Sequence, residues 1–180
     1  MFRFARFAAV LAALTLATPV MAQNYDNVQV YDDKAAVDKD LAVTPAQFKA
    51  VVSGRTVRTY SEEHGNLVEY FASNGKVYVW PAKSNMLIGT WKPCTEDGAL
   101  QDPNGQEKAI KIAAICRTLP NPKGGTQTWN STWVTYGKQI VERAEGDIFS
   151  LSKRTEAPYW MGKRSVNFKG LQANIKKYTK

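Results

Sequence analysis

The stretch from Asn66 to Trp80 reads NLVEYFASNGKVYVW and decides the fold that the sequence predicts. Two runs that alternate between apolar and polar residues are joined by Asn-Gly at 74–75. This pair favours a two-residue type I′ turn, because both turn positions need a positive φ. Such a turn would place Phe71 opposite Tyr78 and so fix which side chains share a face. The predicted core face carries Val68, Tyr70, Ala72, Val77 and Val79, and the predicted ringed face carries Glu69, Phe71, Ser73, Lys76, Tyr78 and Trp80.

The ringed face of this hairpin is predicted to be covered by another part of the same chain. Three bare rings would be an aggregation liability, and burying each one is worth roughly 1.5 to 3 kcal/mol. A Thr N-cap, a Pro at the first helical position and a closing Gly54 predict a short helix over Thr44 to Ser53. Its apolar stripe needs a partner, so we expect this helix to cover Phe71, Tyr78 and Trp80.

From Arg55 onward, short strand-like runs recur about every ten residues, which is typical of an antiparallel meander or small barrel. The runs are residues 55–60, 66–71, 76–80, 86–91, 109–116, 132–136, 138–144 and 147–153. Residues 120–131, rich in Pro and Gly, are predicted to form a long loop. The predicted fold class is mainly β: a small antiparallel barrel or strongly bent sheet with one short N-terminal helix packed on it.

The first 22 residues have the pattern of a secretory signal peptide. Two arginines precede a short apolar run, and small residues lead to a predicted cleavage near Ala22-Gln23. No later segment approaches the ~18 apolar residues of a transmembrane helix, so we expect none in the mature chain. The sequence therefore predicts an exported protein, periplasmic or secreted.

Cys94 and Cys116 are the two cysteines of the chain. An even number of cysteines in an exported protein predicts a disulfide between them. A metal site or a reactive thiol is the alternative, but His64 is the one histidine and the chain has no Cys-x-x-C pair, which leaves too few ligands. No metal and no cofactor is predicted.

Charge divides the predicted mature chain into three parts. Residues 23–43 are an acidic lead-in that we expect to be weakly ordered, residues 44–152 are the β domain, and residues 153–180 form a basic segment. The basic segment carries a net charge of +7, whereas residues 23–152 carry −1. It is either a solvated tail or a contact for an anionic partner. The contact residues would be Lys153, Arg154, Lys163, Arg164, Lys169, Lys176 and Lys177.

Catalytic patterns are missing from the sequence. There is no G-x-S-x-G elbow, and His64 lies in a predicted turn. Glu62 and Glu63 are adjacent, so in an extended chain they would point to opposite faces and could not form a glycosidase pair. The sequence predicts a protein that is not an enzyme and that does not bind nucleic acid.

The order of several short motifs resembles a family of small uncharacterised exported proteins of proteobacteria, known as a domain of unknown function. The motifs are VVSGRTV, the YFASNGKVYVW hairpin, Gly-Thr-Trp at 89–91 and the paired cysteines, within residues 41–155. The family is similar to calycins, the lipocalin-like barrels, which implies a barrel here. In lipocalins the Gly-x-Trp strand opens the barrel, but here it follows at least two strands, and no functional residues are carried over.

Two functions follow from these features. The first is a noncatalytic β-barrel protein that binds a small apolar or amphipathic ligand; the second is a surface-binding or inhibitory envelope module that contacts an anionic partner through the basic segment. An enclosed cavity would favour the first, and a filled core with exposed rings the second. The candidate ligand-binding residues are Tyr70, Val77, Val79, Trp91, Trp129 and Trp160.

Overall fold

The computed structural model describes residues 25–31, 44–83, 85–101, 106–121, 123–132 and 139–179. Within these ranges, eight antiparallel strands form one sheet in the order β1-β8-β2-β3-β4-β5-β6-β7. The strands are β1 (Tyr25–Tyr31), β2 (Arg55–Ser61), β3 (Gly65–Phe71), β4 (Lys76–Pro81), β5 (Leu87–Gln101), β6 (Glu107–Pro120), β7 (Thr126–Thr132) and β8 (Gln139–Glu145). The mainly β prediction is confirmed, but β1 and β7 are free edges of the sheet, so the sheet is not closed into a barrel.

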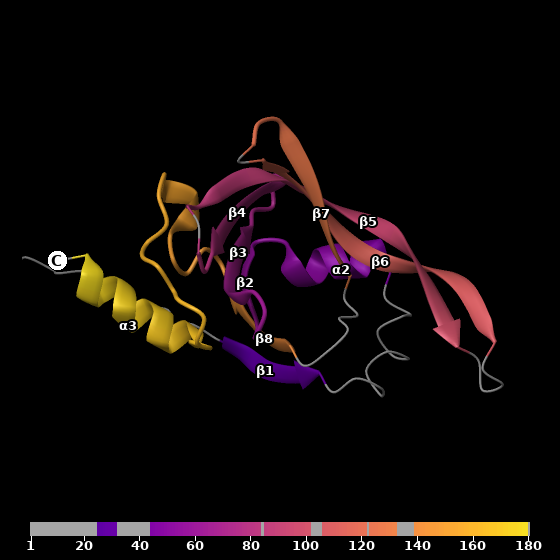
Figure 1. The fold of residues 1–180 in the computed structure, drawn as a ribbon, viewed down its shortest axis with the longest axis horizontal. Coiled ribbons are helices and arrows are strands. Elements are labelled where there is room, and N and C mark those ends of the chain that lie inside the picture. Colours follow the sequence, from indigo (N-terminus) through magenta and orange to yellow (C-terminus); the bar gives the residue numbers. More distant parts are fainter. Residues whose placement is uncertain are drawn as a thin grey trace, which may run out of the picture.

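The sheet bends around helix α2 (Pro45–Val52), which lies inside the curve (Figure 1). Glu69 of β3 and Arg117 of β6 form a buried ion pair, although β4 and β5 lie between their strands. Three strand spacings span roughly 14 Å in a flat sheet, so the curvature brings these side chains together. We call the face that α2 covers the inner face. Its core consists of Phe48, Val52, Val57, Phe71, Val77, Val79, Trp91, Ala113, Ile115 and Leu119.

Helix α2 begins and ends where the sequence predicts. Thr44 Oγ1 accepts a hydrogen bond from the Gln47 N–H at 3.2 Å, and Gln47 Oε1 accepts one from the Thr44 N–H at 2.8 Å. This reciprocal arrangement is a capping box. Gly54 follows the helix with a φ of +73°, a conformation that glycine adopts without steric cost.

The hairpin between β3 and β4 forms as predicted, but its register differs by one residue. Phe71 pairs with Val77 and Tyr70 with Tyr78. The turn is a three-residue loop in which Gly75 alone has a positive φ, of +83°, and the Gly75 N–H donates to the Ala72 carbonyl at 3.0 Å. A three-residue loop with one left-handed glycine is the next most common hairpin connection after type I′, and Asn-Gly fits both.

This shift redistributes the rings over two faces of the sheet. Phe71 lies on the inner face, where its ring packs edge-on against Trp91 at 5.4 Å between centroids. Trp80, fully buried, lies on the opposite, outer face with the half-buried Tyr78. The prediction that the rings are covered by the same chain is confirmed for Phe71 and Trp80, but the prediction that α2 covers all three is wrong.

The C-terminal part of the chain covers the outer face. It includes a 3₁₀ turn, η1 (Leu151–Lys153), and helix α3 (Phe168–Tyr178), which lies beside the sheet in Figure 1. The outer core consists of Val68, Trp80, Ala82, Met86, Ala144, Phe149, Leu151, Met161, Phe168 and Leu171. Because α3 is part of this core, the basic segment is not a solvated tail, and the predicted boundary at residue 152 does not separate two packing units.

Four buried side chains of the sheet hold the backbone of this covering segment, residues 146–168. Thr56 Oγ1 donates to the Gly146 carbonyl at 2.7 Å. Trp80 Nε1 donates to the Tyr159 carbonyl at 2.9 Å. Asn66 bonds Arg164 and Val166, and Glu142 accepts from the Phe168 N–H at 3.1 Å. The segment is thus fixed by specific hydrogen bonds as well as by apolar packing.

Arg58 and Glu142 stand directly opposite each other on β2 and β8 and form a buried ion pair beneath this segment. Arg58 also donates to Asn66 Oδ1 at 3.1 Å. The same Asn66 oxygen accepts from the Val166 N–H, and Glu142 accepts from the first N–H of α3. The pair therefore stabilises the sheet and the segment that covers it at the same time.

Three further sequence predictions are corrected. Strand β7 occupies part of the predicted loop at 120–131, and residues 147–153 form turns and η1, not a strand. Part of the predicted lead-in forms β1, which pairs with β8. The predicted signal peptide, residues 1–22, and most of the predicted strand at 132–136 lie outside the described residues.

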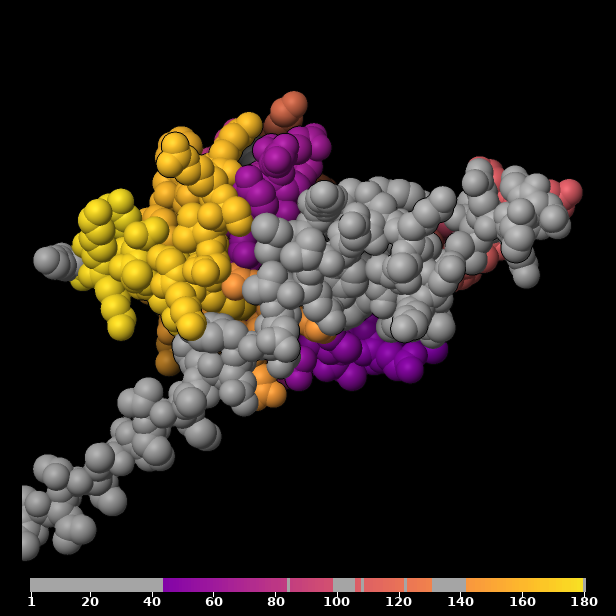
Figure 2. Space-filling model, turned by 90° about the horizontal axis from the view of Figure 1, so that it is seen from below, coloured from indigo at the N-terminus to yellow at the C-terminus, as the bar shows by residue number. Residues whose placement is uncertain are grey.

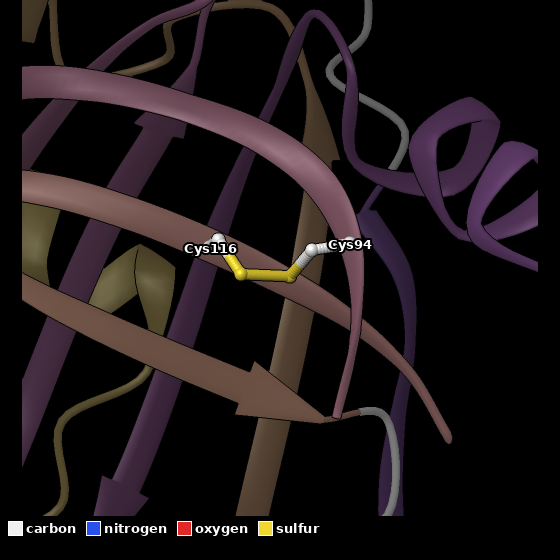
Figure 3. Close-up of a disulfide and its surroundings, with 2 residues drawn as sticks. All are labelled: Cys94 and Cys116. Carbon is white, nitrogen blue, oxygen red and sulfur yellow. A yellow bond between two sulfur atoms is a disulfide. The ribbon is translucent and has the colours of Figure 1, made fainter. Parts of the chain in front are cut away.

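Cys94 and Cys116 form the predicted disulfide between β5 and β6 (Figure 3). Their Cα atoms are 5.9 Å apart. Cys94 pairs with Ala114 in the sheet and Cys116 with Lys92, so the bridge joins diagonal neighbours of two strands that are already hydrogen-bonded.

We expect Trp80→Ala to lower the free energy of unfolding by about 3 to 5 kcal/mol, because it removes a fully buried ring and the hydrogen bond to Tyr159. Urea unfolding followed by far-ultraviolet circular dichroism measures this loss. Trp160→Ala is the matched control: its side chain is 73% exposed, so the change should stay within about 0.5 kcal/mol. Equal losses in the two variants would contradict the assignment of Trp80 to the core.

We expect Glu142→Gln to cost about 3 to 5 kcal/mol, because it leaves the Arg58 charge buried without its counter-ion. Glu145→Gln on the same strand is the control, since Glu145 is exposed and lies 3.7 Å from Arg55. Such a surface pair is worth about 1 kcal/mol or less. Chemical denaturation of both variants tests the difference, and similar midpoints would mean that the buried pair has no special role.

Candidate functional site

Four of the candidate ligand-binding residues, Tyr70, Val77, Val79 and Trp91, do not all lie on one face of the sheet. Val77, Val79 and Trp91 lie in the inner core, where they pack with Phe48 and Val52 of α2. All three are buried. Tyr70 lies on the outer face, half-buried, with its ring stacked on Tyr78 at 6.1 Å. The sheet thus separates Tyr70 from the other three residues.

The two remaining candidate rings are both on the surface but on different elements. Trp129 is 37% exposed and lies on edge strand β7, opposite Arg117 of β6. Trp160 is 73% exposed and lies in the loop between η1 and α3. Trp160 is thus the more exposed ring of the two, and its surroundings define the candidate site.

The loop that carries Trp160 is held on both sides of the ring. The carbonyl of Tyr159 accepts from Trp80, and the carbonyl of Arg164 accepts from Asn66 Nδ2 at 2.6 Å. Between these bonds, Met161 is buried in the outer core. The backbone is therefore fixed while the Trp160 side chain extends into solvent.

A second exposed ring lies close to this loop. Tyr178, at the end of α3, is 61% exposed, and its ring contacts that of Tyr159 at 5.4 Å. The other side of Tyr159 packs edge-on against Trp80 at 5.1 Å. Burial in this position raises the pKa of Tyr159, so its phenol stays protonated and neutral well above neutral pH.

Basic side chains surround these rings. Lys163 and Arg164 are exposed on the loop, and the ammonium of Lys177 lies 5.6 Å from the centre of the Tyr178 ring. Lys153, Lys169 and Lys176 are also exposed, whereas Arg154 is half-buried and donates to the Phe149 carbonyl at 3.0 Å. Figure 2 shows that the residues from about 150 onward gather at one end of the molecule.

One cation of this surface, Lys83, was not predicted from the sequence. It follows β4, and Gly65 lies close both to the adjacent Ala82 and to the backbone at 162–163. A Cβ on Gly65 would lie 3.2 Å from both the Ala82 Cβ and the Gly162 carbonyl oxygen, and Gly65 has a φ of +75°, so a larger residue there would be both crowded and strained. Lys163 shares a hydrogen bond with Lys83, and this contact lowers the pKa of Lys83 below its ordinary value. Two lysine side chains thus meet on an open surface.

We define the Trp160 surface by its two exposed rings and its nearest cations: Trp160, Tyr178, Lys83, Lys163, Arg164 and Lys177. Two acidic residues of the same region are already engaged. Glu142 is buried with Arg58, and both carboxylate oxygens of Asp147 accept hydrogen bonds from the backbone of η1 at 2.7 Å. The surface therefore combines aromatic rings with positive charge.

The described ranges hold little that would suit another kind of site. No group of three or more His, Cys, Asp or Glu side chains lies close enough there to hold a metal ion. In the part of the chain that the structure describes, no helix has both the length and the apolar character needed to cross a bilayer. His64 is exposed in a turn, with its Nε2 3.7 Å from a carboxylate oxygen of Glu63.

Comparisons of the chain with protein-family models, with curated proteins and with solved structures gave no match. The resemblance to exported calycin-like proteins therefore stays a prediction.

We expect Lys163→Ala to raise the pKa of Lys83 toward the ordinary lysine value of about 10.4, because it removes the second ammonium. A nuclear magnetic resonance titration of the lysine side chains measures this change. Lys153→Ala removes an exposed cation elsewhere in the same segment and should leave the pKa of Lys83 where it is. An unchanged Lys83 titration in Lys163→Ala would contradict the contact.

Proposed function

We propose that this protein is a noncatalytic, surface-binding module of the periplasm or extracellular space that docks on an anionic partner through the Trp160 surface. Export is part of the proposal and rests on the pattern of residues 1–22. The observation that supports it best is the 73% exposure of Trp160 on a loop whose backbone is fixed on both sides.

A tryptophan side chain this exposed on an ordered loop is unusual unless a partner covers it. Tryptophan is highly buried on average, and its large ring supplies much of the contact energy in interfaces. The hydrogen bonds from Trp80 and Asn66 order the loop before any partner arrives. Because the loop is already ordered, binding a partner would cost little of the conformational entropy that a flexible loop loses when it becomes ordered.

Charge indicates the nature of the partner. The cations of residues 153–179 outnumber the acids, with Glu156 the single acidic residue among them. Helix α3 contains no acidic residue, and its three lysines are exposed. A surface of one sign attracts partners of the opposite sign and raises their association rate.

The alternative, a small apolar ligand inside a barrel, has less support. It would need a cavity among residues that pack instead with α2, and it would need Tyr70 on the other side of the sheet. We therefore do not propose it.

The test is binding of the purified protein to three anionic probes at about 0.15 M salt, near physiological ionic strength. The probes are phosphatidylglycerol vesicles, dextran sulfate and polyglutamate, with neutral dextran as the blank. We expect binding to at least one anionic probe. Lys163→Ala/Arg164→Ala should weaken it by about tenfold or more, because each cation near an anionic surface contributes about fivefold.

The control variant is Lys92→Ala/Lys123→Ala, which removes the same two charges from β5 and from the turn before β7. Both lysines are exposed, so the variant should fold normally and keep most of its affinity. Equal weakening in both double variants would mean that net charge alone drives binding. That result, or no binding to any anionic probe, would overturn the proposal.

A further inference from the structure

We propose that the anionic partner is the surface of a phospholipid bilayer, with Trp160 and Tyr178 entering the headgroup region and the exposed cations of the Trp160 surface meeting the lipid phosphates. This inference rests on the proposed function and specifies its partner.

The two exposed rings are of the kind that bilayer interfaces favour. Tryptophan and tyrosine have an apolar body and a polar tip, and both concentrate at the headgroup level of membranes. Tyr159 links the two residues. Its ring contacts the ring of Tyr178, and it directly precedes Trp160 in the sequence. Both exposed rings therefore lie on the part of the chain that covers the outer face of the sheet.

Helix α3 supplies charge to this patch but cannot itself be the inserted element. Phe168 and Leu171, on its apolar side, are buried in the outer core. Lys176 and Lys177 are exposed at the end next to Tyr178. The arrangement places ammonium groups beside the rings, where lipid phosphates would lie, and needs no unfolding of the helix.

Lys83 and Lys163 add two exposed cations to this surface. The backbone at 162–163 lies close to Gly65, and Gly65 lies close to Ala82, the neighbour of Lys83 in the chain, so the two lysines belong to the same region. Lipid phosphates that lie beside them would accept charge-assisted hydrogen bonds from ammonium groups of this kind.

Lipid is favoured over an anionic polysaccharide because the amide side chains near the rings are already engaged. Sugar hydroxyl groups need hydrogen-bonding partners of fixed orientation. Asn66 bonds three groups of the protein, Asn167 accepts from the Gly170 N–H at 2.9 Å, and Asn174 bonds Tyr159. The exposed rings and cations of this surface match the groups that a lipid headgroup region binds.

The experiment compares sedimentation with vesicles of phosphatidylglycerol and phosphatidylcholine mixed and of phosphatidylcholine alone, and records tryptophan emission. We expect the mixed vesicles to bind at least tenfold more tightly. Emission should shift to shorter wavelength, and lipids brominated near the headgroup should quench it. Both signals should be lost in Trp160→Phe and kept in Trp129→Phe, the control for the other exposed ring.

The lysine pair is tested with Lys83→Ala/Lys163→Ala against Lys92→Ala/Lys123→Ala. We expect at least a tenfold loss of affinity for the mixed vesicles in the first variant and less than a threefold loss in the second. Binding without a Trp160 emission change, or equal loss in the two variants, would overturn the inference. If dextran sulfate or polyglutamate binds and vesicles do not, the bilayer inference fails while the proposed function stands; if no anionic probe binds, both fail.

Discussion

The buried ion pair between Arg58 and Glu142 is the interaction on which the outer half of the molecule depends. Burying two charges is costly unless all their hydrogen bonds are made, and here Asn66 and the first N–H of α3 complete them. Glu142 joins the sheet to the covering segment directly, and Asn66, itself in β3, bonds Arg164 and Val166 of that segment. The buried Arg58 needs Asn66 as a hydrogen-bond partner, and the same Asn66 donates to the Arg164 carbonyl. The loop that carries Trp160 is therefore ordered by the contacts of the buried ion pair.

A second buried pair, Glu69 with Arg117, has the corresponding position on the inner face. It joins β3 to β6 across the curve, while α2 fills the space beside it with Phe48 and Val52. The two pairs point to opposite sides of one sheet, and neither could form if its strand were displaced by one residue. In this molecule, buried polar contacts and apolar packing on both faces together fix the strand register, and the packing supplies most of the stability.

Local signals predicted a large part of this fold. The cap and proline of α2, the alternation of β2 to β4 and the disulfide all follow from residues close in sequence or from cysteine count. The hairpin register was wrong because Asn-Gly suits both a two-residue and a three-residue loop, and only packing on both faces decides between them. The role of residues 146–179 could not be predicted, because it depends on Thr56, Asn66 and Glu142, which are distant in sequence. The sequence alone predicts Trp160 and the cations that follow residue 152 as candidate site residues. Lys83 could not be predicted in this way, because it comes near them only through the close approach of Gly65 to Gly162.

The position of β8 has a consequence for how the chain assembles. Strand β8 lies between β1 and β2, so β1, the first strand in sequence, has its described pairing with the last. During synthesis, β1 would emerge more than a hundred residues before its partner, whereas β2 to β5 pair with successive neighbours. We expect the central meander to form early and the closing of β8 against β2 to be slow, because contacts between distant residues require a large loop to close first. The edge strand at the N-terminus is then the last piece of the sheet to be added.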